Sequence, residues 1–200
     1  MEILFKQSPN YSTSTQKKLG VVLHFTLGAY KGAVEWLCNG NRPNRSSAHY
    51  IIGRNEGELT QIVKDIDVAW HAGNISNPTE RFTKIALKNL DGTYVNPNKY
   101  LIGIELACGY DMNNNKIVDP AEYKITDWQY KCLAELMKKW NFPADYVLSH
   151  NDIASYKENA NEVRSEILAR LVGEVVKEET VCVPVPKSKV EKVLAFLKTI

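Results

Sequence analysis

The sequence predicts an α/β fold in which a mixed central β-sheet is flanked by helices. Two observations predict it. Short apolar runs rich in β-branched residues alternate along the chain with segments whose apolar residues recur at helical spacing. The chain has 200 residues, of which 44% are hydrophobic, and this suits one domain with a single core. Alternating strands and helices favour a sheet that is covered by helices.

The first half of the chain predicts three strands and a short helix. Residues 19–25 form an apolar run that ends near a histidine, which indicates a buried strand. Residues 31–38 can form a short helix. Residues 47–53 and 58–63 have the composition of strands, and the turn signal at 54–57 between them predicts a hairpin.

The middle of the chain contains a polar segment followed by an apolar one. Residues 74–99 are polar and interrupted by prolines, so we expect a long surface excursion there, with a helix at 78–90. Residues 100–108 are almost continuously apolar and predict a second core strand.

The clearest single element is a helix at residues 126–140. Thr126 and Gln129 have the spacing of a capping box, and apolar residues then recur at helical spacing. Residues 146–150 predict a strand that ends in a histidine. A further helix is indicated by the apolar residues Val163, Ile167, Leu168, Leu171 and Val172.

We expect one domain over residues 1–173, followed by a C-terminal tail over residues 174–200 that contains a short helix. The formal charge is only +2, and Lys and Arg are scattered, so composition does not indicate a nucleic-acid partner. No segment approaches the roughly 20 apolar residues of a membrane span. The first residues lack the apolar core of a signal peptide, so we expect synthesis in the cytoplasm without a signal peptide.

The four cysteines have no paired spacing, and most of them occur in apolar stretches. A thiol in such a place behaves as a small hydrophobic group. We therefore expect reduced core residues, not ligands or disulfides, at Cys38, Cys108, Cys132 and Cys182.

Two histidines and one glutamate are candidates for chemistry. His24 and His150 end predicted strands, where α/β folds place their sites, and neutral imidazole is a common zinc ligand. Ordinary hydrogen-bonded histidines would have the same spacing. Glu105 interrupts an apolar strand, where an unpaired carboxylate is costly. A catalytic acid or base with a raised pKa would explain it, and so would a salt bridge at the core edge.

Five ordered segments resemble the type 2 family of N-acetylmuramoyl-L-alanine amidases, which includes phage lysozyme-type amidases and peptidoglycan recognition proteins. The resemblance covers about residues 19–172. The order of the segments is more specific than any one of them. They are VVLHFT (21–26), SAHYIIGR (47–54), AWHAG (69–73), IGIEL (102–106) and LSHNDI (148–153), which is followed by Lys157.

The resemblance implies hydrolysis of the amide between N-acetylmuramic acid and L-alanine in peptidoglycan or its muropeptides, with Zn²⁺ as cofactor. His24 and His150 match the two histidine ligands of the zinc ion. Glu105 matches the residue that takes a proton from the attacking water, and Lys157 matches the lysine that stabilises the oxyanion. His71 matches a residue near the substrate or behind the metal ligands.

The third ligand in the family is an Asp or Cys two residues after the lysine, and this position is Asn159. An amide oxygen is a poorer zinc donor than a carboxylate or thiolate. Three alternatives follow: Asn159 binds weakly, Glu158 or Glu162 replaces it, or the protein is an inactive peptidoglycan-binding module. Retention of both Glu105 and Lys157 favours the enzyme.

Two further expectations concern calcium and biological role. Residues 111–122 carry oxygen side chains at several positions of an EF-hand-like loop, which allows Ca²⁺ binding, although Lys116 stands where that loop needs glycine. The alternative is a plain polar loop. A chain without a signal peptide fits a phage endolysin, and equally a cytoplasmic enzyme that recycles cell-wall fragments.

Overall fold

The computed structural model describes residues 1–111, 116–117, 124–157, 160–161 and 163–170. The chain divides into two compact units, Met1–Arg164 and Ser165–Ile200. The predicted tail at 174–200 lies outside the described residues, so the predicted boundary after residue 173 remains a prediction.

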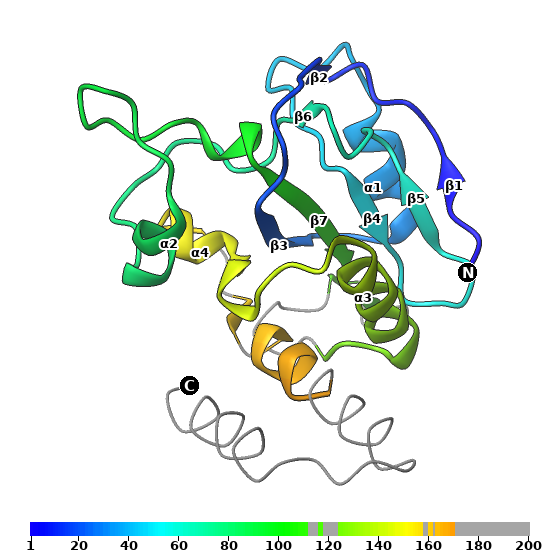
Figure 1. The fold of residues 1–200 in the computed structure, drawn as a ribbon. Coiled ribbons are helices and arrows are strands. Elements are labelled where there is room, and N and C mark those ends of the chain that lie inside the picture. The colour runs from blue at the N-terminus through cyan, green and yellow to red at the C-terminus, as the bar shows by residue number, and fades with distance from the viewer. Residues whose placement is uncertain (112–115, 118–123, 158–159, 162, 171–200) are drawn as a thin grey trace, which may run out of the picture. The chain divides into compact units, whose positions relative to one another are not determined.

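A six-stranded mixed sheet forms the centre of the first unit (Figure 1). The β4–β5 pair is antiparallel, which confirms the predicted hairpin, and the other neighbouring pairs are parallel. The two long strands β7 and β3 lie next to each other inside the sheet, and burial on both faces explains their nearly continuous apolar sequence. In spatial order the strands are β1 (Leu4–Phe5), β5 (Leu59–Gln61), β4 (Tyr50–Ile52), β7 (Leu101–Ala107), β3 (Gly20–Thr26) and β10 (Val147–Ser149).

Helices cover both faces of this sheet. Neighbouring residues of a strand point to opposite faces. The helix α1 (Tyr30–Leu37) packs on Ile51, whereas α3 (Asp127–Trp140) contacts Tyr50 through Trp140, at 5.6 Å between ring centres. The two helices therefore lie on opposite faces, as the predicted α/β architecture requires.

The helix α3 has the predicted capping box. The Thr126 hydroxyl accepts the Gln129 backbone N–H at 3.2 Å, and the Gln129 side-chain oxygen accepts the Thr126 N–H at 3.1 Å. Asn141 ends the helix in the left-handed conformation at φ 52°. Both ends of this helix are therefore fixed by local hydrogen bonding.

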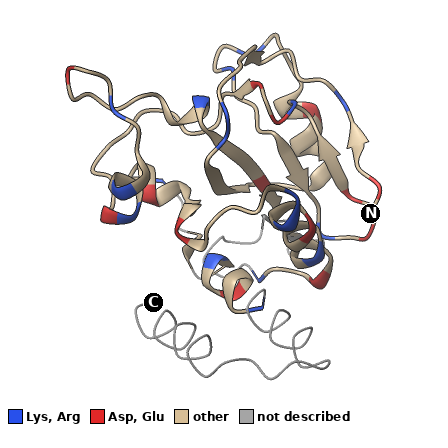
Figure 2. Cartoon of the chain, viewed as in Figure 1, with Lys and Arg blue, Asp and Glu red and all other residues tan. Residues whose placement is uncertain are grey.

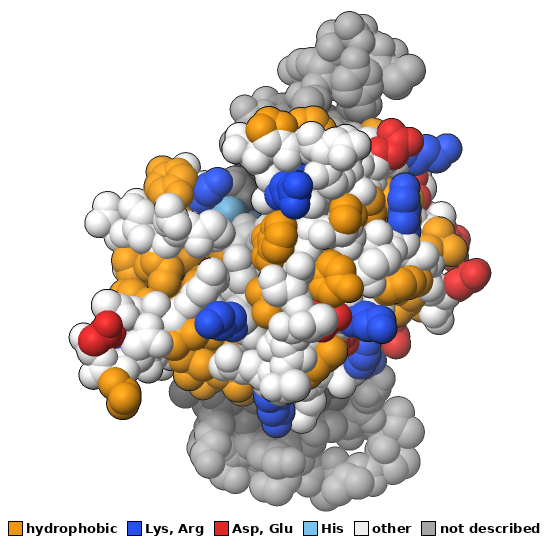
Figure 3. Space-filling view, turned by 90° about the horizontal axis from the view of Figure 1, so that it is seen from above, with side chains coloured by type: hydrophobic (Ala, Val, Ile, Leu, Met, Phe, Trp, Pro, Cys, Tyr) orange, Lys and Arg blue, Asp and Glu red, His pale blue; other side chains and the backbone are white. Residues whose placement is uncertain are grey.

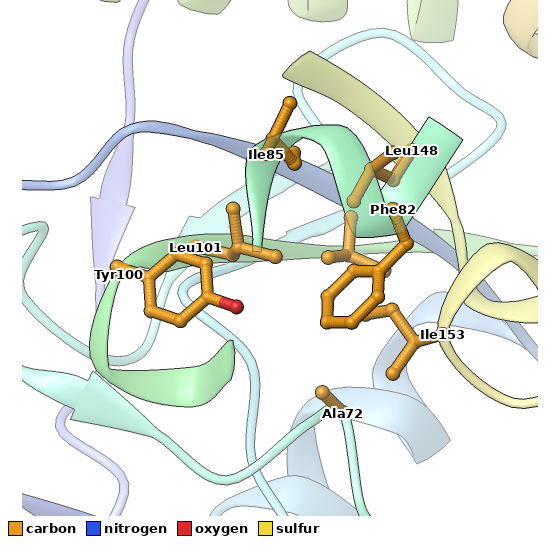
Figure 4. Close-up of a cluster of buried hydrophobic side chains, with 8 residues drawn as sticks. Ala72, Phe82, Ile85, Tyr100, Leu101, Leu148 and Ile153 are labelled. Carbon is orange, nitrogen blue, oxygen red and sulfur yellow. The ribbon is translucent and has the colours of Figure 1, made fainter. Parts of the chain in front are cut away.

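The predicted surface excursion at 74–99 is only partly correct. The short helix α2 (Glu80–Ile85) buries Phe82 and Ile85 in a core cluster with Leu101 of β7 (Figure 4). Because these side chains are needed in the core, the segment returns to the body of the domain. The exposed part is a projection around Leu90, which is closed by the bridge between Lys88 and Tyr94. The predicted helix at 78–90 is correspondingly shorter.

Several elements are too short for periodicity to reveal. The strand β2 (Tyr11–Ser12) pairs with β6 (Val68–Ala69), and β8 (Tyr110–Asp111) pairs with β9 (Lys116–Ile117). A 3-10 turn at Pro97–Lys99 leads into β7, and another at Ala144–Tyr146 leads into β10. The short helix α4 (His150–Ile153) follows β10 directly. Residues 163–170 are helical, in agreement with the predicted final helix.

The cysteines differ in their environments. Cys108 and Cys132 are buried, as predicted for core residues, whereas Cys38 is only half-buried because it lies just past the end of α1. Cys182 lies outside the described residues. Within the part of the chain that the structure describes, no helix has the length and apolar character needed to cross a bilayer.

Candidate active site

His24 and Glu105 lie side by side near the carboxyl ends of two parallel strands. They are register partners on β3 and β7, so both side chains point to the same face of the sheet. The sheet is almost free of charged residues, and Glu105 is the acidic residue of β7 (Figure 2). Glu105 is half-buried and lines a pocket of about 550 Å³ together with residues of α1. An ionisable group at this edge of an α/β sheet has the usual position of a functional residue.

Two histidines from distant parts of the chain, His71 and His150, contact His24. Its Nε2 atom lies 3.0 Å from Nδ1 of His71, which follows β6, and its Nδ1 atom lies 2.9 Å from Nδ1 of His150. All three rings are buried, with 1%, 8% and 5% of the surface of His24, His71 and His150 exposed. His150 is the first residue of α4, where the sequence had predicted the end of a strand.

Backbone carbonyls determine which nitrogen of each neutral ring carries the proton. His71 Nε2 lies 3.3 Å from the Leu101 carbonyl and donates to it, so His71 Nδ1 accepts the Nε2 proton of His24. His150 Nε2 lies 3.1 Å from the Ala72 carbonyl and donates to it. His24 and His150, when neutral, therefore turn two unprotonated Nδ1 atoms toward each other at 2.9 Å. Such a pair repels unless a cation lies between the two nitrogens.

The buried environment of His71 favours the neutral form of its ring. Burial lowers the pKa of His71 well below 6.5, and the neighbouring His24 and His49 lower it further. Neutral imidazole is the form that binds metal ions and that can relay a fixed hydrogen bond.

The two facing nitrogens fit a zinc ion. Zn–N bonds of about 2.0–2.1 Å at a tetrahedral centre place two donor nitrogens roughly 3.3 Å apart. The distance of 2.9 Å between His24 Nδ1 and His150 Nδ1 is close to that spacing. Among the residues that the structure describes, no group of three or more His, Cys, Asp or Glu is arranged to hold a metal ion. Asn159, the predicted third ligand, lies outside the described residues.

Asn98 holds the segment that carries His71. Its side-chain oxygen accepts the backbone N–H groups of His71 at 3.2 Å and Ala72 at 2.8 Å. The same contact positions the Ala72 carbonyl, which accepts from His150. Sequence reasoning missed Asn98, because an asparagine after Pro97 gives no signal beyond a turn.

Asp152 fixes the start of α4, where His150 lies. The carboxylate is 1% exposed, accepts the Ser149 N–H at 2.8 Å and the Thr79 hydroxyl at 2.8 Å, and pairs with Arg81 at 3.0 Å. Sequence reasoning missed this residue too, although the spacing from Ser149 to Asp152 is that of a capping box.

His49 is a structural neighbour of the site. Its Nδ1 atom accepts the Gly103 N–H at 2.9 Å, and its Nε2 atom donates to the Asp67 carbonyl at 3.0 Å. Burial, and to a smaller extent the charge of Lys18, lowers the pKa of His49 to about 3. Gly103 must lack a side chain because a Cβ atom there would come within 2.4 Å of His71 Cγ.

The family described as N-acetylmuramoyl-L-alanine amidase matches residues 14–162, which contain all of these groups. The chain belongs to this amidase family. The predictions of the family and of the mixed sheet flanked by helices are thereby confirmed.

Relatives of this chain differ in how much of it they share. N-acetylmuramoyl-L-alanine amidase A of Achromobacter lyticus is 39% identical over 67 residues, which are 34% of this chain and 37% of that protein. The AmpD crystal structure of a selenomethionine derivative is 25% identical with a TM-score of 0.52, over 78% of this chain and 86% of AmpD. A mutant endolysin from Bacillus subtilis, at 17% identity and a TM-score of 0.52, covers 86% of this chain and 98% of its own and shares the fold.

The remaining predicted site residues of this amidase are less completely described. Lys157 is half-buried shortly after α4, its N–H donates to the Ala154 carbonyl at 2.9 Å, and its ammonium lies 5.4 Å from the ring centre of Tyr156. Most of the proposed calcium loop at 111–122 lies outside the described residues, and so the calcium prediction remains a prediction.

Proposed function

We propose that this chain is a zinc-dependent amidase that cleaves the bond between the lactyl group of N-acetylmuramic acid and L-alanine in bacterial peptidoglycan. The observation that carries the proposal is the pair of unprotonated nitrogens, His24 Nδ1 and His150 Nδ1, facing each other at 2.9 Å beside a pocket that Glu105 lines. Family membership supports the bond that is cut.

His24 and His150 are the proposed zinc ligands, with Asn159 or a neighbouring acid as the third. A zinc ion there would act as a Lewis acid that polarises the scissile carbonyl and makes water more acidic. The Ala72 carbonyl orients His150, and His71, which donates to the Leu101 carbonyl, orients His24, so little reorganisation is needed when the metal binds.

Glu105 is the proposed general base. A water molecule attacks the carbonyl carbon, and its proton passes to the Glu105 carboxylate as the new C–O bond forms. When the C–N bond breaks, Glu105 returns this proton to the departing amino group of L-alanine. The position of Glu105, next to His24 and open to the pocket, suits both transfers.

Lys157 is the proposed oxyanion-stabilising group. Negative charge develops on the carbonyl oxygen during attack, and a fixed ammonium placed nearby lowers the energy of that state. The sequence position of Lys157, shortly after α4 and His150, supports this role.

The test measures metal content and bond cleavage in the same preparations. Purified protein should contain stoichiometric zinc and should release peptides with a free N-terminal alanine from purified peptidoglycan, and a chelator should stop this release. Glu105→Gln should abolish release while zinc content and folding stay unchanged, whereas the control Glu2→Gln, at an exposed position before the edge strand β1, should remain active. Cell-wall binding without metal and without release would overturn the proposal in favour of a peptidoglycan-binding module.

The same assay tests the endolysin role. Hydrolysis of intact cell-wall sacculi would support an endolysin that acts on the polymer. Activity confined to soluble muropeptides would instead favour an enzyme that recycles cell-wall fragments.

A further inference from the structure

The helix α1 exposes a tryptophan beside the pocket that contains Glu105. Trp36 is 61% exposed, although α1 buries Ala33 and Leu37 on its inner side. Trp36 lines the pocket, as does Glu105. On the face drawn in Figure 3, hydrophobic side chains are dispersed among polar ones and Lys and Arg. An exposed indole at the rim of a functional pocket is most simply explained by a ligand that covers it.

The indole is held in place from one side. The Arg42 guanidinium lies 4.1 Å from the centre of the Trp36 ring, and its Nη2 atom donates to the Ser46 hydroxyl at 3.1 Å. Arg42 is only 9% exposed and is not among the residues that line the pocket. The cation therefore stacks on one face of the indole and leaves the pocket side for a ligand.

Gly32 leaves open space in the same pocket. It lies inside α1, where glycine is less favourable than alanine. A Cβ atom at Gly32 would meet no atom within 4 Å, so neither packing nor a close approach explains the glycine. Gly32 also lines the pocket. The open space beside Gly32 therefore leaves room for a bound molecule.

The charge of the pocket indicates which part of the substrate it takes. Among the lining residues that the structure describes, Glu105 is the ionisable one. The stem peptide carries carboxylates, which would need a Lys or Arg partner. The muramoyl sugar is neutral when its lactyl carboxyl is joined to alanine, and the apolar face of a sugar ring can stack on an indole.

We propose that this pocket binds the N-acetylmuramoyl sugar, with Trp36 as the stacking platform and Gly32 as the space for the ring. The inference rests on the proposed function, because it assigns one part of that substrate to one part of that site. Arg42 is a positioning residue that holds the indole.

The experiment measures binding separately from hydrolysis. Calorimetric titration of protein carrying Glu105→Gln, which prevents turnover, uses two ligands: N-acetylmuramoyl-L-alanine and a sugar-free stem peptide. Trp36→Ala should weaken the muramoyl ligand about tenfold, as expected for one lost aromatic contact, and should leave the peptide unchanged. Trp36→Phe should restore part of the affinity.

Gly32→Ala should raise the thermal stability and lower the affinity for the muramoyl ligand. The substitution should raise Tm by about 2 to 4 °C, because alanine favours the helix, and it should weaken the muramoyl ligand by filling the pocket. The control Lys31→Ala, on an exposed position of α1 outside the pocket, should leave binding unchanged. A stability gain without a binding loss would refute the assignment of Gly32.

The outcomes separate this inference from the proposed function. Unchanged muramoyl affinity in Trp36→Ala and Gly32→Ala, or a loss confined to the stem peptide, would overturn the sugar assignment even if wild-type protein cleaves peptidoglycan. Trp36-dependent binding of the muramoyl ligand by a protein that releases no alanine-terminated peptide would support the sugar site and refute the amidase.

Discussion

Replacing His71 tests whether a buried histidine behind the proposed zinc ligands controls zinc binding. In His71→Phe the ring volume is kept, but the Nε2 proton of His24 loses its acceptor at 3.0 Å. His24 can then place its proton on either nitrogen, and the tautomer with Nδ1 protonated cannot bind a metal ion through Nδ1. We expect weaker zinc binding.

The magnitude follows from two independent considerations. A buried donor left without a partner costs roughly 1–3 kcal/mol. Loss of a hydrogen bond behind a metal-bound histidine typically lowers metal affinity about 10- to 100-fold, which is about 1.4 to 2.8 kcal/mol. The two ranges agree, so His71→Phe should lower zinc affinity by at least about tenfold.

The assay is competition for zinc with a coloured chelator, combined with ¹⁵N NMR of the histidine rings in metal-free protein. His71→Asn is the conservative variant, because its side-chain oxygen reaches near the position of the histidine Nδ1 and can accept from His24. It should recover much of the affinity and keep the Nε2-protonated form of His24. His49→Phe removes a buried histidine whose ring centre lies 5.8 Å from that of His71, outside the hydrogen-bonded chain, and it serves as the control.

A His71→Phe protein that binds zinc as tightly as wild type, with His24 still protonated on Nε2, would refute this reasoning. Equal losses in His71→Phe and His49→Phe would assign the effect to packing instead of to the hydrogen bond.

The remaining predictions concern stability. Burial lowers the pKa of His49 to about 3 in the folded protein. Between pH 6.5 and 3 the unfolded chain therefore binds more protons than the folded protein. The contribution of neutral His49 to the free energy of unfolding is fully present above about pH 6.5 and is lost as the pH falls. This loss is on the order of 5 kcal/mol by pH 3, and about 2 kcal/mol of it falls between pH 7 and pH 5. Urea unfolding at pH 7 and pH 5 should show this pH dependence, which flattens in His49→Gln. Gly103→Ala should cost roughly 1–3 kcal/mol and weaken zinc binding, because the new Cβ atom displaces His71; calorimetric melting that matches wild type would contradict this. Asp152→Ala should cost roughly 1–3 kcal/mol because it leaves the buried Ser149 N–H and the Thr79 hydroxyl without their acceptor, whereas an unchanged urea midpoint would show that these bonds are dispensable.

The sequence predicts the central strands and α3 because their physical requirements are local. The strands β3 and β7 are buried on both faces, so nearly every residue must be apolar, and Glu105 stands out for that reason. The helix α3 needs an apolar stripe and a cap, and both can be read from neighbouring positions.

The sequence predicts much less of the support around the candidate site. The strands β1, β2 and β6 have two residues each, too few for an alternating pattern. The contact between His24 and His71 joins positions 47 residues apart, and the bond from Asn98 to His71 spans 27 residues. Such contacts depend on how loops return to the sheet, which neither composition nor periodicity encodes.

The anchoring of the histidine chain on backbone carbonyls affects how the site can change under mutation. The acceptors are the main-chain oxygens of Leu101 and Ala72, which every amino acid at those positions retains. Substitution there cannot delete the hydrogen bonds that orient the rings. Most point mutations should therefore leave the orientation of the rings unchanged, and the residues that hold the backbone itself, such as Asn98 and Gly103, should be the sensitive positions. The pocket and the surface of the protein can therefore vary widely while His24 Nδ1 and His150 Nδ1 remain in place.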